Sequence, residues 1–306
     1  MNQIHQSRFR GRTFYLSYRD VKVLNFLWTW KLASTATIHQ AIVRPGSRYS
    51  AYKVMERLEK HGYVRPYVSG EHRFTAWQLT EKGFLSIKNS LGELTEEGYL
   101  SEYPWHDRHI LAFQLGEWSW FNLPVVAHFT EQDLRRRPAD LYPAWVPHTP
   151  GHRADGYTKI EGKGRTWVFA LEVELSLKSI ARYESVIRYY RTQSQVDRVL
   201  WLTSDPSVMN AIKTAKTNVK DAQDTYHVFV DLKDYQENGW DAKITNERSE
   251  TLFTMREHIG VVIGDPYREY IGTVGGVSKV TDHYDPVKVL GKSRASRSAA
   301  RATFSD

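Results

Sequence analysis

The 306-residue sequence contains no cysteine, which excludes disulfides, thiolate metal sites, iron–sulfur clusters and cysteine nucleophiles. It also lacks an apolar run of the roughly 20 residues that a membrane span requires. The longest apolar stretches are Val21–Trp30 and Ile259–Gly264. Met1–Arg12 carries three arginines without a following apolar core, so no secretory signal is expected. The sequence therefore predicts a cytoplasmic protein with no membrane partner.

Several motifs of well-known chemistry are also missing. The chain has no glycine-rich phosphate loop, no His-Glu-x-x-His and no Gly-x-Ser-x-Gly. These absences argue against a nucleotide hydrolase with a phosphate loop, a zinc protease and a serine hydrolase. The glycines between Gly272 and Gly276 follow no long strand, and we interpret them as part of a loop.

Negative charge is scarce at both ends of the chain. Residues 1–90 hold 15 Lys/Arg against 5 Asp/Glu, residues 91–285 hold 22 against 29, and residues 286–306 hold 5 against 1. Basic segments attract polyanions by releasing condensed counterions. We therefore expect double-stranded DNA as the partner. An acidic membrane surface is a weaker alternative because no amphipathic anchor is present, and a merely solvated basic surface is another.

Residues 1–90 predict three helices followed by a hairpin. Ser17 can begin the first helix, Ser34 the second, and the third runs from about Ser47 to His61, where Gly62 ends it. Beyond that glycine the apolar period changes to two, in two short strand-like runs joined by a turn. This order predicts a winged helix-turn-helix, although such a domain can also serve protein contacts.

The third helix of a winged helix enters the major groove, and the hairpin reaches flanking phosphates. We interpret the helix as presenting a basic and aromatic outer face, and the hairpin as carrying further cations. The predicted DNA-binding residues are Arg48, Tyr49, Tyr52, Lys53, Arg57, Arg65 and Arg73.

A linker and a second domain follow. Residues 91–104 have few periodic apolar positions, residues 105–285 alternate strand-like and helical runs, and residues 286–306 read as a basic tail disordered in isolation. The second domain is therefore expected to be an α/β or α+β fold around a mixed sheet. Its predicted elements are helices over 106–120, 178–191 and 206–217, and strands over 125–129, 157–160, 167–175, 199–202 and 226–230.

Two glutamates interrupt the otherwise apolar strand of 167–175. Glu172 and Glu174 alternate with Val173 and so point to the same face. Asp155 precedes the partner strand, so hairpin pairing would bring it close to Glu172, and Lys178 follows four residues after Glu174. Hard oxygen ligands of this kind suit Mg²⁺ or Mn²⁺, which activates water against a phosphodiester while a lysine stabilises developing charge.

The predicted catalytic residues are therefore Asp155, Glu172, Glu174 and Lys178, with Asp155 and Glu172 as metal ligands. Two alternatives stay open: solvent-facing glutamates with a surface salt bridge to the lysine, or a decayed nuclease site kept as scaffold. The attacking group is water or a tyrosine. Further candidates are the Val173 carbonyl as a third ligand, His109 and Glu117 as additions to the site, and Tyr183, Tyr189 or Tyr190 as the tyrosine.

Asp155, then Glu172-Val173-Glu174, then a lysine resembles the PD-(D/E)xK core of restriction-endonuclease-like proteins. Ala154 stands where that motif often has proline, and Glu174 occupies the usual lysine position, which leaves Lys178 as a displaced substitute.

Together with the Trp77-x-Leu79-Thr80-x-x-Gly83 exit of the hairpin, the arrangement resembles the replication-relaxation family over about residues 14–232. That family includes conjugative relaxases of the MobC class, in which a winged helix precedes an endonuclease-like domain. The resemblance implies site-specific nicking at a transfer or replication origin of a mobile element, with other relaxosome or replication proteins as partners. A non-catalytic DNA-binding regulator or relaxosome accessory is the alternative.

Overall fold

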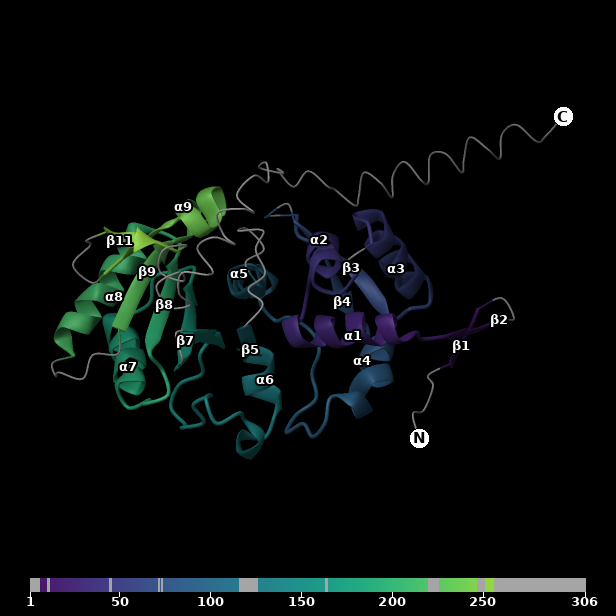
Figure 1. Ribbon diagram of the computed structural model, residues 1–306, viewed down its shortest axis with the longest axis horizontal. Coiled ribbons are helices and arrows are strands. Elements are labelled where there is room, and N and C mark those ends of the chain that lie inside the picture. Colours follow the sequence, from purple (N-terminus) through teal and green to yellow (C-terminus); the bar gives the residue numbers. More distant parts are fainter. Residues whose placement is uncertain are drawn as a thin grey trace.

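A computed structural model shows a seven-stranded mixed sheet beside a smaller N-terminal group of helices, with α5 (Pro104–Leu115) and α6 (Glu131–Arg136) between them (Figure 1). The predicted combination of helices with a mixed sheet is confirmed. The structure describes residues 6–9, 12–43, 46–70, 72, 74–115, 126–162, 165–219, 226–246 and 251–255. The predictions made for Arg73, Glu117 and residues 256–306, the basic tail included, lie outside the described residues.

Serine side chains begin the N-terminal helices because their hydroxyl oxygens accept hydrogen bonds from backbone N–H groups of the first turn. The capped helices are α1 (Tyr18–Trp30, Ser17), α2 (Thr35–Ile38, Ser34) and α3 (Arg48–Lys60, Ser47). After α3, Gly62 adopts a φ of 73°, in the left-handed region that favours glycine, and the chain turns into a strand. These boundaries agree with the sequence prediction.

The hairpin consists of β3 (Val64–Val68) paired antiparallel with β4 (Thr75–Leu79). It leads into α4 (Glu81–Ile87), in which Gly83 lies against the carbonyl of Tyr63. A Cβ atom at that glycine would come 2.0 Å from the carbonyl oxygen. The close approach of α4 to the hairpin therefore requires a residue without a side chain.

One apolar core joins the N-terminal elements. Leu24, Leu27 and Trp28 of α1 pack with Met55 and Leu58 of α3, all fully buried. The remaining short elements are β1 (Gln6–Phe9), β2 (Arg12–Tyr15), a π-helical turn (His39–Val43) and 3₁₀ turns (Lys88–Ser90, Ala139–Leu141, Gly239–Asp241).

The large sheet has the strand order β11-β10-β9-β8-β7-β6-β5. Strands β7, β8 and β9 run parallel to one another, and the neighbouring pairs at both edges are antiparallel. The strands are β5 (Val126–Thr130), β6 (Gly156–Gly162), β7 (Arg165–Glu174), β8 (Arg198–Thr203), β9 (Tyr226–Asp231), β10 (Lys243–Thr245) and β11 (Thr251–Thr254).

Helices cover both faces of this sheet. Along β7, Phe169, Leu171 and Val173 join the apolar cluster of α5 and α9 (Leu232–Asn238), while Val168 and Ala170 join the cluster on the other face. That second cluster contains α7 (Ile180–Arg191) and α8 (Pro206–Asn218). Because side chains alternate along a strand, Glu172 and Glu174 point to the same face, as predicted, and this is the face that α7 covers.

Several elements differ from the sequence prediction. Helix α6 is not among the predicted elements; it follows β5 directly, since Thr130 and Asp133 form a capping box. Helix α9 and strands β10 and β11 extend the fold beyond the last predicted strand. Lys178 precedes α7, because Ser179 is its N-cap. In the described part of the chain, no helix is both long and apolar enough to cross a membrane.

The segment predicted as a linker packs closely between the two parts. The carbonyl of Gly98 accepts hydrogen bonds from Trp28 Nε1 at 3.0 Å and from Gln132 Nε2 at 2.9 Å. The backbone N–H of Thr95 donates to the carbonyl of Arg136 at 2.7 Å. Residues 91–103 contain neither helix nor strand, but these bonds fix them against α1 and α6.

Candidate active site

A cavity of about 730 Å³ lies between the β3–β4 hairpin and the end of β7. Its walls come from the hairpin, from the segment that leads into α5, and from the sheet with the start of α7. All four predicted catalytic residues line it: Asp155, Glu172, Glu174 and Lys178. The structure therefore brings the predicted cluster together at one sheet edge.

Asp155 immediately precedes β6 and lies opposite β7. Its backbone N–H donates to the carbonyl of Leu171 at 3.1 Å, and its Oδ2 accepts from the backbone N–H of Val173 at 2.6 Å. His106 Nε2, from α5, lies 3.5 Å from the same oxygen and 3.0 Å from the Val173 carbonyl oxygen. Burial would raise the pKa of Asp155, but His106 and the backbone hydrogen bond hold it below its ordinary value.

The pKa of His106 shifts in the opposite direction. Burial favours the neutral ring, but the charge of Asp155 outweighs it and raises the pKa of His106 to about 9. At neutral pH the pair is therefore an ion pair of imidazolium and carboxylate.

Glu172 is 4% exposed and makes two strong contacts through Oε1. His152 Nε2 lies 2.6 Å from this oxygen, and the Tyr190 hydroxyl donates a hydrogen bond to it. Although burial opposes it, the charge of Glu172 raises the pKa of His152 above its ordinary value. Burial and the same carboxylate raise the pKa of Tyr190, which keeps its hydroxyl a donor.

Glu174 is 5% exposed and pairs with Lys178, whose Nζ lies 2.8 Å from both of its carboxylate oxygens. Burial raises the pKa of Glu174, and Lys178 only partly offsets that effect. Because both glutamates are buried, the interpretation of a solvent-facing strand is wrong.

The three candidate tyrosines lie on α7. Tyr183 and Tyr190 are fully buried, and Tyr183 accepts a hydrogen bond from the backbone N–H of Lys178 at 3.1 Å. Burial raises the pKa of Tyr183, Tyr189 and Tyr190. A raised pKa disfavours the phenolate that would attack phosphorus, so these tyrosines suit structural hydrogen bonds better than nucleophilic attack.

His109, proposed from the sequence as an addition to the site, lies in the core of α5. It is fully buried, its Nδ1 lies 2.6 Å from the carbonyl oxygen of Trp105, and burial lowers its pKa to about 4. His109 is not among the described residues that line the cavity. His109 is thus a neutral core residue of α5.

The predicted DNA-binding residues are not equally placed on the surface. Tyr49 and Lys53 of α3 and Arg65 of β3 are exposed, and Arg48 is half-buried. Tyr52 is only 4% exposed, so its assignment to the outer face of α3 is wrong. The physical reason is the helical period, which places Tyr52 beside Ala51 and Met55 on the core side.

Arg57 also has a structural role. Its guanidinium forms an ion pair with Asp20, the fully buried carboxylate of the α1 capping box. This contact ties α3 to the start of α1. It also neutralises part of the positive charge that α3 carries on this face.

The cavity lining also includes charged or titratable residues to which the sequence analysis gave no role in the site, among them His106, His152, Arg153 and Arg182. Arg153 lies between two other site residues along the chain, His152 and Asp155, so proximity to the predicted aspartate was the one available signal. His106 comes from α5 on the opposite sheet face, and no local sequence pattern predicts its contact with Asp155.

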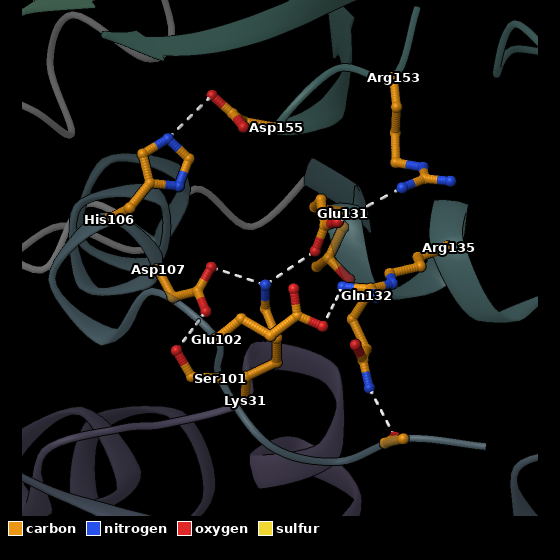
Figure 2. Close-up of polar contacts among 12 residues, drawn as sticks. Lys31, Ser101, Glu102, His106, Asp107, Glu131, Gln132, Arg135, Arg153 and Asp155 are labelled. Carbon is orange, nitrogen blue, oxygen red and sulfur yellow. Dashed lines mark hydrogen bonds and ion pairs between the residues drawn. The ribbon is translucent and has the colours of Figure 1, made fainter. Parts of the chain in front are cut away.

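A buried ion network connects the site to the N-terminal helices (Figure 2). Lys31, directly after α1, places Nζ 2.6 Å from Asp107 Oδ1 and 2.7 Å from Glu131 Oε2. Asp107 also accepts from the Ser101 hydroxyl at 2.5 Å, and it is the neighbour of His106 on α5. One residue of the N-terminal group thereby holds both helices that lie between the two parts.

The predicted Mg²⁺ or Mn²⁺ ion would need carboxylate oxygens that are not already used by other contacts. The hydrogen bonds and ion pairs of the described residues use Oδ2 of Asp155 and Oε1 of Glu172, while the Val173 carbonyl faces His106. Within the described ranges, no three or more His, Asp and Glu side chains lie where they could bind one metal ion together. Mg²⁺ commonly takes one or two carboxylates and completes its shell with water and substrate phosphate, and the two carboxylates fit that requirement.

Comparisons with family models, with curated proteins and with solved structures gave no match to this chain.

Proposed function

We propose that this protein binds duplex DNA through a winged helix in residues 1–90 and nicks one strand, with a divalent metal ion, at an endonuclease-like site. The observation that carries the proposal is the convergence of Asp155, Glu172, Glu174 and Lys178 in one cavity that faces the β3–β4 hairpin. An origin of transfer or replication on a mobile element is the target that the family resemblance suggests, and relaxosome or replication proteins are the partners.

The proposed DNA binding is supported by the order of the N-terminal helices and strands and by their positive charge. Three helices and a hairpin follow one another with the caps and pairing described above, and α3 exposes Tyr49 and Lys53. Residues 1–90 hold 15 Lys/Arg against 5 Asp/Glu. A basic helix beside a hairpin is the geometry by which winged helices place one helix in the major groove.

Each site residue then has a definite role. Asp155 and Glu172 would hold the metal through the second oxygen of each carboxylate, and the bound ion would supply Lewis acidity at the phosphate. His106 and His152 fix the first oxygens and so orient both ligands. Glu174, paired with Lys178, would accept a hydrogen bond from the attacking water, and Lys178 would stabilise charge on the phosphate.

The rival function is a non-catalytic DNA-binding regulator or relaxosome accessory. The observation in its favour is that all three carboxylates already have cationic partners: Asp155 has His106, Glu172 has His152, and Glu174 has Lys178. A site neutralised in this way can persist as a scaffold without a metal ion.

Nicking of a supercoiled plasmid that carries a cognate origin, with Mg²⁺ or Mn²⁺, separates the two functions. The wild type should convert supercoiled to nicked circles, Glu172→Gln should abolish both nicking and the rise in melting temperature that the metal causes, and Lys178→Ala should lose nicking alone. Glu184→Gln, on α7 but outside the cavity and paired with Arg188, is the matched control and should nick normally. A wild type that neither nicks nor responds to either metal supports the rival.

A further inference from the structure

The cavity of the candidate site has two chemically different ends. Aromatic rings line the end near the hairpin, and cations line the end near α7 together with the carboxylates. The rings are Tyr67, His72, Tyr103 and Trp105, and the cations are Lys178 and Arg182.

The aromatic end presents flat ring surfaces. His72 stacks on Trp105 with ring centroids 3.9 Å apart and an interplanar angle of 14°. His109 packs edge-on against Trp105 at 4.4 Å and fixes the indole from the core side. Tyr103 is 72% exposed although it lines the cavity, so one large ring is available to a ligand without any rearrangement.

From this we infer, on the basis of the proposed function, that the cavity binds one unpaired nucleotide of a DNA strand, with its base on the rings around Tyr103 and its phosphate at Lys178 and Arg182. A volume of about 730 Å³ falls within the range of about 300–1,000 Å³ typical of small-molecule sites. It admits a single nucleotide and not a base pair in its stack, so the nucleotide must leave the duplex, as in enzymes that flip bases.

The same chemistry could come from a free mononucleotide, so the experiment has two arms, both with the full chain and a metal chelator so that no cleavage is needed. One arm compares deoxyadenosine 5′-monophosphate with deoxyribose 5-phosphate, which keeps the charge and lacks the base. The other compares a duplex with one extrahelical adenine against the same duplex with an abasic residue there. Binding is followed by protein-observed NMR in the first arm and by fluorescence anisotropy in the second.

The duplex with the extrahelical adenine should bind about tenfold more tightly than the abasic duplex, the size expected for one base stacked on an aromatic ring. Tyr103→Ala should remove this difference, and Tyr103→Phe should keep it. Tyr18→Ala, a ring 77% exposed on α1 and outside the cavity, should change nothing.

An equal affinity for the two duplexes overturns the inference, even where the plasmid is nicked normally. A preference for the base in the mononucleotide arm alone also overturns it, because the ligand would then be a free nucleotide. A base preference that depends on Tyr103 in a protein that never nicks DNA upholds the inference and rejects only the catalytic half of the proposed function.

Discussion

Loss of the Lys31 charge should destabilise the fold, because Lys31 lies at the centre of a buried ion network. Its side chain is 13% exposed and lies within 2.7 Å of carboxylate oxygens on both Asp107 and Glu131. Burial would lower the pKa of Lys31, but these two carboxylates raise it, so the ammonium is fully charged in the folded state. Lys31→Met keeps the length of the side chain and leaves Asp107, itself buried, without its cation.

Breaking a buried ion pair by removing one partner costs about 3–5 kcal/mol, chiefly because the other charge stays buried and uncompensated. At about 2 °C per kcal/mol for a chain of this size, the melting temperature should fall by roughly 6–10 °C. Circular dichroism measures it. The double variant Lys31→Met/Asp107→Asn should recover part of the loss because the uncompensated charge is gone.

Lys53→Met is the matched control, since Lys53 pairs with Glu56 on the exposed face of α3, and its melting temperature should equal that of the wild type. The reasoning is refuted if Lys31→Met melts like this control, or if the double variant is less stable than the single one.

Three further predictions concern DNA binding, packing and pH. Lys53→Ala and Arg65→Ala should each reduce the slope of log affinity for duplex DNA against log salt by about one, whereas Tyr52→Ala should chiefly lower the melting temperature because Tyr52 is buried. Equal slopes in wild type and both basic variants would contradict the α3–hairpin interface. Gly83→Ala should destabilise by about 1–3 kcal/mol in denaturant titrations, despite the better helix propensity of alanine, because a Cβ would meet the Tyr63 carbonyl oxygen at 2.0 Å. A neutral or stabilising result would show that α4 can shift. Burial, aided by Lys216, lowers the pKa of His227 to about 3, and Trp201 Nε1 donates to its Nδ1 at 2.9 Å. The unfolded chain therefore takes up a proton at His227 near pH 6.5 that the folded chain refuses, so the contribution of this histidine to stability is full above that pH and falls by about 1.4 kcal/mol per pH unit below it. His227→Gln should flatten this dependence in melts between neutral pH and about pH 5, and an unchanged slope would refute the assignment.

The local elements were largely predictable because their signals are local. Ser17 with Asp20 sets the start of α1, and Gly62 sets the end of α3, since a cap or a left-handed residue acts within one turn. The position of Asp155 followed from hairpin geometry, as the observed pairing of Gly156 with Leu171 places it beside Glu172. A short antiparallel register is fixed by its turn and needs no knowledge of the remaining fold.

The partners of the carboxylates could not be read from the sequence, because they come from other segments. His106 reaches Asp155 from a helix on the opposite sheet face, and His152 reaches Glu172 from a loop without periodicity. Lys31 sits between Trp30 and Leu32, where nothing marks it as the centre of an ion network. Such contacts depend on how whole elements pack, and side-chain spacing along the chain does not determine that packing.

The first turn of α5 makes three contacts in three directions with three consecutive residues. Trp105 stacks with His72 of the hairpin, His106 pairs with Asp155 in the candidate site, and Asp107 binds Lys31 after α1. Since neighbouring residues on a helix project about 100° apart, a single turn can contact three structures at once. A displacement of the hairpin relative to the sheet must then strain or break one of these contacts. The position of Asp155 is therefore coupled mechanically to the N-terminal helices through α5, and weakening the Lys31 pair should loosen the candidate site as well as the fold.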